Sequence, residues 1–216
     1  MKRIAIMLLA ALLLLALAGA SATSAVGQDN TAIAINTKDG TDIFKLAFKI
    51  ARVNQDVVDQ SNAAVAFNSC EECQSIAVAF QIVLIFSDPA IVSSQNLAIA
   101  INQECSACVA FASAYQWLLT TDGPVHFTPD GNKRLAELKK RLRELLKSEI
   151  TMEQLQAELA QIKNEVADIL ANELVAAGHK DENSTTTTET PTTTEAPVTT
   201  TTTEPTTTEG STSTTP

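Results

Sequence analysis

The chain has 216 residues and carries 15 Lys and Arg against 25 Asp and Glu, which gives a formal net charge of −10. An acidic chain with only 4% aromatic residues lacks the basic surface and the stacking side chains of a nucleic-acid-binding protein, so we expect no nucleic-acid partner. The length is sufficient for one ordinary folded domain.

Residues 1–25 have the order of a secretory signal peptide. Lys2 and Arg3 are followed by an apolar run over residues 4–18, and then by small residues that allow cleavage after Ala22 or Ala25, of which we favour Ala25. The alternative is that the run is kept as an anchor, because it nearly reaches spanning length. After cleavage the net charge is about −12, and we expect a secreted or extracytoplasmic cell-envelope protein with no membrane association.

A threefold repeat lies between residues 30 and 119. Residues 62–85 and 96–119 align, with one residue inserted before the second cysteine pair, as N-x-A-x-A-x-N, C-x-x-C and A-x-A-aromatic-Q. A more diverged copy covers residues 30–50, where Lys38-Asp39-Gly40 replaces the cysteine pair. Because this replacement is a turn sequence, each C-x-x-C is also expected to lie at a turn.

The apolar runs on either side of each turn alternate with a period of two, which favours β-strands. Helices are the competing interpretation, because short Ala-rich runs also favour helix. We therefore predict an α+β fold with a repeat β domain over residues 29–128. Its three β-hairpin-like repeats form one sheet of about six strands, and two amphipathic helices and a disordered tail follow.

A helical segment is predicted over residues 129–178. Thr128-Pro129 gives an N-cap with Pro at the first helical position, and Thr151 with Gln154 forms a capping box. Leucines at helical spacing, separated by charged residues, give each helix one apolar face. Gly178 is the expected C-cap. The helices are expected to pack on the sheet or on each other, and a helix-mediated homodimer is an alternative.

Residues 183–216 are a low-complexity segment in which 19 of 34 residues are Thr. Such a segment has too little apolar surface to offset its chain entropy, so we predict a disordered tail that resembles an O-glycosylated stalk.

The four cysteines are the only strong chemical signal in the sequence. In an exported chain, cysteines usually form disulfides, and we favour Cys70–Cys73 and Cys105–Cys108, with pairing between the two turns as the alternative. The same four residues could instead be zinc ligands, since two C-x-x-C turns can supply a tetrahedral thiolate site. Thiol–disulfide exchange is a third interpretation, although no thioredoxin-like βαβ pattern surrounds either pair.

Catalytic motifs such as H-E-x-x-H, G-x-S-x-G and a Gly-rich phosphate loop do not occur in the sequence. His126 and His179 are far from each other in the sequence, and Asp39 with Asp42 falls far short of a calcium loop. Tyr115 and Trp117 are expected in the core. We therefore predict a protein that is not an enzyme and that needs no cofactor, with zinc as the alternative.

The repeats also resemble an uncharacterised family of exported actinobacterial proteins. The resemblance rests on NTAIAINTKDG, DVVDQSNAAVAFNSCEECQSIAVAFQIVLI, NLAIAINQECSAC and GPVHFTPDGNKRLAELKKRL, and it covers about residues 29–147. Members of the family are sometimes labelled as membrane peptide zinc metalloproteases, but the protease motif is absent here. The resemblance implies a bacterial envelope location.

Together these observations predict a non-enzymatic cell-envelope protein with a structural or interaction role, with disulfide-closed turns and a Thr-rich stalk. Its partner would be a cell-surface protein or a wall component of unknown identity. The alternative is a four-cysteine zinc-binding or thiol-redox domain.

Overall fold

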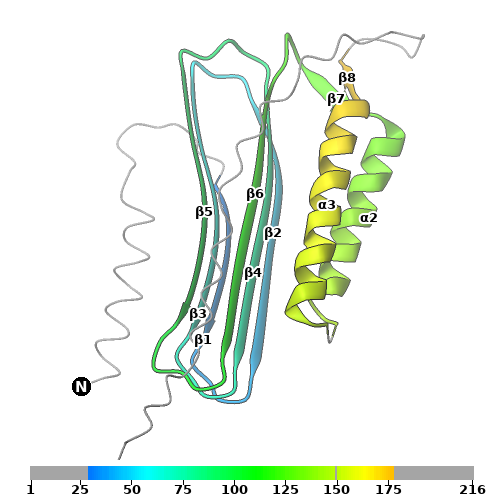
Figure 1. Cartoon of the computed structure of the whole chain (residues 1–216). Coiled ribbons are helices and arrows are strands. Elements are labelled where there is room, and N and C mark those ends of the chain that lie inside the picture. The colour runs from blue at the N-terminus through cyan, green and yellow to red at the C-terminus, as the bar shows by residue number, and fades with distance from the viewer. Residues whose placement is uncertain (1–28, 149, 178–216) are drawn as a thin grey trace, which may run out of the picture.

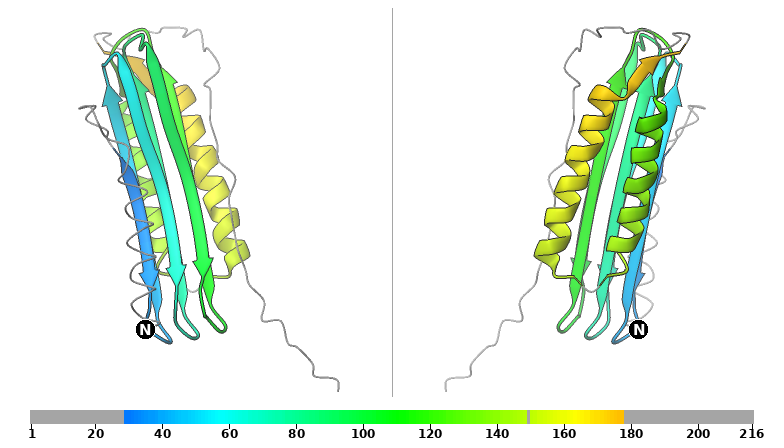
Figure 2. Two further views of the ribbon diagram at one scale, coloured as in Figure 1. Left: turned by 90° about the vertical axis from the view of Figure 1, so that its left-hand side faces the viewer. Right: turned by 90° about the vertical axis from the view of Figure 1, so that its right-hand side faces the viewer.

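The computed structural model describes residues 29–148 and 150–177. Two β-sheets lie face to face, and two antiparallel helices cover the outer face of one of them (Figures 1 and 2). The predicted α+β class, the three strand-forming repeats and the two following helices are confirmed. The predicted signal segment, residues 183–216, Gly178 and His179 lie outside the described residues. Within the described residues, no helix is long and apolar enough to cross a membrane.

Each repeat forms one coil of a parallel β-solenoid. The first coil consists of β1 (Asn30–Asn36) and β2 (Asp42–Val53), the second of β3 (Val57–Asn68) and β4 (Gln74–Ile85), and the third of β5 (Ile91–Asn102) and β6 (Val109–Thr120). The odd-numbered strands form a sheet of order β1-β3-β5, here called sheet A, and the even-numbered strands form a sheet of order β2-β4-β6, here called sheet B.

The expected hairpin pairing is wrong. The two strands of a repeat lie in different sheets, and each strand pairs in parallel with the equivalent strand of the next repeat. The physical reason is that both faces of the alternating strands of sheet B are apolar, so each strand has to be covered on two sides. A single hairpin sheet would cover one face only, whereas the solenoid buries one face between the sheets and the other under the helices.

The strand register is the one that the repeat alignment implies. Asn30, Asn62 and Asn96 are register partners in sheet A, and Phe48, Phe80 and Tyr115 are register partners in sheet B. In-register parallel stacking places identical side chains one above another, which is why the repeat preserves each residue type at its position.

The layer between the sheets is made mainly of alanine. Its members are buried side chains from all three coils: Ala32, Ala34, Ala64, Ala66, Ala77, Ala79, Ala100, Ala110, Ala112 and Ala114. Such small side chains allow the two sheets to approach closely. The asparagines of sheet A can therefore reach across the layer, so that Asn62 donates to the main-chain oxygen of Tyr115 at 2.9 Å and Asn68 donates to that of Val109 at 2.8 Å.

The outer face of sheet B forms the main core with helices α2 (Pro129–Leu145) and α3 (Met152–Asn172). The Thr128 side chain caps α2, and the predicted capping box of Thr151 and Gln154 is present on α3. A short strand, β7 (Val125–Phe127), precedes the two helices.

The helical segment predicted to reach residue 178 ends earlier, because α3 stops at Asn172. The chain then forms β8 (Leu174–Ala176), which pairs antiparallel with β7. This pairing ties the end of the helical pair to the segment that leads into it, near the loops that connect successive coils in Figure 1.

Candidate functional site: a four-cysteine cluster

The cysteines lie in two stacked turns, one between β3 and β4 and the other between β5 and β6. The stacking of the coils continues through these turns, because Glu71 and Ser106 form a parallel bridge and the Glu72 amide donates to the Ser106 carbonyl at 2.9 Å. The solenoid therefore places the second C-x-x-C directly beside the first.

The tight turns require a left-handed backbone at one position in each coil. Gly40, Glu72 and Ala107 have φ values of 62°, 51° and 54°. Glycine adopts this conformation without strain, whereas Glu72 and Ala107 carry a Cβ and are strained in it. The inserted residue of the third repeat, Glu104, also has a positive φ of 47°, so the extra residue is accommodated inside the turn without altering the strand register.

All four cysteine sulfurs lie within 4.8 Å of one another. The sulfurs of Cys70 and Cys73, and those of Cys105 and Cys108, are at bonding distance, and the Cα atoms within each pair are 6.2 Å and 5.9 Å apart. The Cys73 sulfur is also 3.3 Å from the Cys108 sulfur and 3.9 Å from that of Cys105.

This geometry suits two kinds of chemistry. The Cα separations fall within the range of disulfides. In a tetrahedral zinc–thiolate site with zinc–sulfur bonds of about 2.3 Å, the sulfurs are roughly 3.8 Å apart, which is close to the distances between the two turns. The cluster can therefore close each turn covalently, or hold one tetrahedrally coordinated ion between the two turns.

The first coil shows what the cysteine pair replaces. Lys38 and Thr41 occupy the positions of the two cysteines. The Thr41 hydroxyl oxygen lies 2.7 Å from the Lys38 carbonyl oxygen and 3.0 Å from the Asn36 side-chain oxygen, and either oxygen can accept its single proton. A hydrogen bond thus closes the first turn at the point where sulfur atoms meet in the other two.

The burial of the cysteines is uneven. Cys70 and Cys73 are 5% and 3% exposed, whereas Cys105 and Cys108 are half-buried in the outermost turn. A reductant or a metal ion would therefore reach the cluster from the side of the third coil.

The other residues considered from the sequence do not join this cluster. Asp39 accepts a hydrogen bond from the Glu71 amide at 2.9 Å and so links the first two turns. His126 is exposed on β7. Tyr115 and Trp117 are buried, as predicted, and Tyr115 stacks on Phe80 with ring centroids 4.7 Å apart.

Two polar arrangements were not identified from the sequence. The first is the set of side-chain ladders along the solenoid. Asn30 donates to Asn62 and Asn62 to Asn96, both at 2.8 Å, and Gln116 donates to Gln81 at 2.7 Å. The repeated Asn and Gln at fixed offsets within apolar runs are the sequence feature that could have predicted these ladders.

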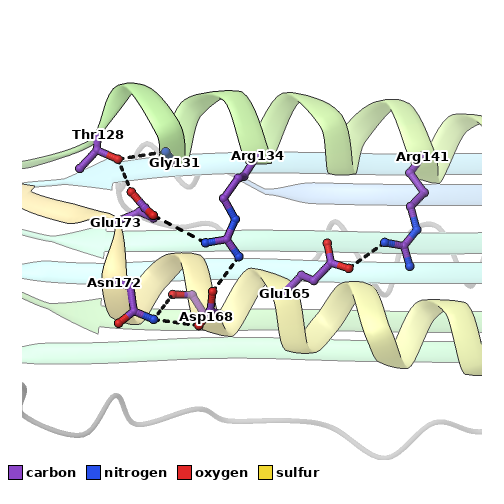
Figure 3. Close-up of polar contacts among 8 residues, drawn as sticks. All are labelled: Thr128, Gly131, Arg134, Arg141, Glu165, Asp168, Asn172 and Glu173. Atoms are coloured by element: carbon purple, nitrogen blue, oxygen red, sulfur yellow. Dashed lines mark hydrogen bonds and ion pairs between the residues drawn. The ribbon is translucent and has the colours of Figure 1, made fainter.

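The second arrangement is a set of ion pairs between the helices (Figure 3). Arg134 pairs with Asp168 at 2.7 Å, and Arg141 pairs with Glu158 at 2.8 Å and Glu165 at 2.7 Å. Hydrogen bonds to Glu158 and Glu165 raise the pKa of Arg141, and one to Asp168 raises that of Arg134.

A charged hollow between the helices is lined by these arginines and by Glu137, Leu138, Lys140, Glu144 and Glu165. Both arginines in this hollow therefore already form ion pairs between the two helices.

Comparison with protein-family models, with curated proteins and with solved structures finds no match to this chain.

Proposed function

We propose that this chain is an exported, non-enzymatic protein of the cell envelope whose solenoid serves as a rigid structural or interaction module. The resemblance to exported actinobacterial proteins and the signal-like segment over residues 1–25 support the location. A Thr-rich segment over residues 183–216 would hold the folded body away from the cell surface.

The observation that carries this proposal is the use of the buried polar side chains. Asn62 and Asn68, both fully buried, and Gln116, which is 2% exposed, donate to neighbouring coils or to the facing sheet. Polar groups inside the body are therefore engaged in holding the coils in register. Catalytic groups, by contrast, are usually held in a cleft where a substrate can reach them.

In this proposal the cysteines form two disulfides that fix the second and third turns. A disulfide that spans so few residues constrains the unfolded chain only weakly, so its main effect would be on turn geometry. It would hold Glu72 and Ala107 in their left-handed conformations.

The test is the mass of the full chain, secreted from a bacterial host by its own N-terminal segment and measured unfolded with and without a reductant. We expect recovery outside the cytoplasm, cleavage after Ala25, and a gain of about four mass units on reduction, because each disulfide takes up two hydrogens. Retention in the cytoplasm, or free thiols before reduction, would contradict the proposal.

The second candidate is a four-cysteine zinc site, which is favoured by the gathering of all four sulfurs within 4.8 Å. In this case the native mass would exceed the unfolded mass by one zinc ion, with no change on reduction. Replacing zinc by Co²⁺ would give thiolate-to-cobalt absorption, and Cys108→Ser should abolish it. Thr41→Ser, at the equivalent position of the first coil, is the matched control and should leave the absorption unchanged.

A further inference from the structure

The two ends of the solenoid differ in charge. Residues 30–53 of the first coil contain six charged residues, whereas residues 91–120 of the third coil contain only Glu104. Among the described residues, no strand pairs with the outer edge of β5 or of β6. The third coil therefore ends the solenoid with two strands of 12 residues that carry no charged side chain.

The first coil carries features that oppose further strand pairing. Lys45 is the register partner of Ala77, and Lys49 is the register partner of Gln81, so both lysines occupy positions that face the layer between the sheets. Lysines at inward positions of an edge strand are a known obstacle to edge-to-edge association. In addition, β1 has only 7 residues, so it would leave much of a longer partner strand unpaired.

The third coil exposes apolar side chains instead. Four of the six large apolar residues that are exposed among the described residues belong to it, namely Ile91, Val92, Leu97 and Val109. Val92 is 49% exposed, whereas its register partner Val58 is 1% exposed because a further coil covers it. The Gln ladder also ends here, and the buried Oε1 of Gln116 has no hydrogen-bond partner.

We propose that the third coil is an interaction surface for a second copy of this chain, and that the two copies associate through their third coils. Joining a third coil to a first coil would place Lys45 and Lys49 in the interface and would also leave both ends open to further growth. Joining two third coils pairs uncharged, apolar edges of equal length. The pairing is antiparallel about a twofold axis, and it leaves only the lysine-bearing ends exposed, so association stops at the dimer.

The test is light scattering on the secreted full chain over a range of concentrations. The wild-type chain should have twice the mass of one chain. Val92→Lys, which places a lysine at an inward position of the open edge, should weaken association at least tenfold. Leu97→Lys, on the same coil, should act in the same direction. The matched control is Ile35→Lys, which changes a side chain of nearly equal exposure on the first coil, 39% against 40%, and should leave the dimer intact.

Each other outcome would overturn the proposal. A wild-type chain that stays monomeric at every concentration would mean that another part of the chain, or nothing, covers the third coil. A dimer that survives both Val92→Lys and Leu97→Lys would place the interface elsewhere, for example on the helices. Loss of the dimer in Ile35→Lys, or growth beyond the dimer, would favour association of a third coil with a first coil.

Discussion

At the scale of single residues, the buried asparagines of sheet A hold the two sheets together across the alanine layer, because they form hydrogen bonds within their own sheet and to the facing one. Asn62 receives a hydrogen bond from Asn30, donates to Asn96 and also reaches the Tyr115 carbonyl on the facing sheet. One side chain thus links all three coils and both sheets. Leucine at this position would be too large for the space between the sheets, and alanine would leave buried polar groups without partners.

We expect Asn62→Ala to lower the free energy of unfolding by about 2–4 kcal/mol, because it leaves buried partners unsatisfied. Asn102→Ala is the control, since Asn102 is half-buried at the end of its ladder, and it should cost about 1 kcal/mol. Urea unfolding of both variants provides the measurement. Equal losses would mean that the central position of the ladder has no special importance.

Lys139 is a second residue whose effect can be measured, in this case on the pH dependence of stability. Its ammonium lies 4.7 Å from the centre of the Phe48 ring, and its pKa is lowered by burial and, to a smaller extent, by Arg143. Since the folded state then binds the proton less tightly than the unfolded state, stability should rise with pH in the interval just below the ordinary lysine pKa of 10.5. Lys139→Met should remove this rise in urea unfolding measured across that interval, and an unchanged pH dependence would contradict the assignment.

At the scale of elements, the helical pair is a cover for sheet B. Leu138 and Leu142 of α2 and Ile162 and Val166 of α3 are buried against its outer face. The apolar faces of both helices are therefore buried, and Arg134 and Arg141 of α2 form ion pairs with α3. Arg141 contacts Glu158 and Glu165, which both belong to the facing helix.

We expect Arg141→Met to destabilise the protein by about 1 kcal/mol, because one guanidinium binds two carboxylates at partly exposed positions. Lys140→Met removes only the 3.7 Å pair with Glu144, in which both side chains are largely exposed, and should cost about 0.3 kcal/mol. Thermal unfolding at low and high salt measures both effects. An Arg141 effect that does not decrease with salt would argue against ion pairing as its cause.

At the scale of the whole molecule, the solenoid has a buried middle coil between two unlike ends. We expect amide hydrogen exchange to be slowest in β3 and β4, which are paired on both edges. In the dimer proposed above, β5 and β6 should exchange more slowly than β1 and β2. In Val92→Lys, amide exchange in β5 and β6 should become faster, whereas unchanged exchange rates would argue against pairing of the third coils.

The sequence predicted the repeats and the strands, because the same residues recur at the same offsets. It also predicted the helix caps, which depend on local chemistry at Thr128 and Thr151. Alternation shows which residues share a face, but it does not show which strand lies alongside, so hairpins and solenoid coils could not be distinguished. The proximity of Cys73 to Cys108 depends on the stacking of the coils and could not be predicted from either C-x-x-C alone.

The similarity of the three coils has a consequence for how the chain reaches its native state. During folding, a strand of the first coil could pair with the third coil and skip the second, since Asn30 matches Asn96 as well as it matches Asn62. Features in which the coils differ oppose such an exchange. Among them are the inward Lys49 of the first coil, which has glutamine in its place in the other two, and the extra Glu104 in the third turn. During folding, these positions would therefore favour the native order of strand pairing over pairing between the wrong coils.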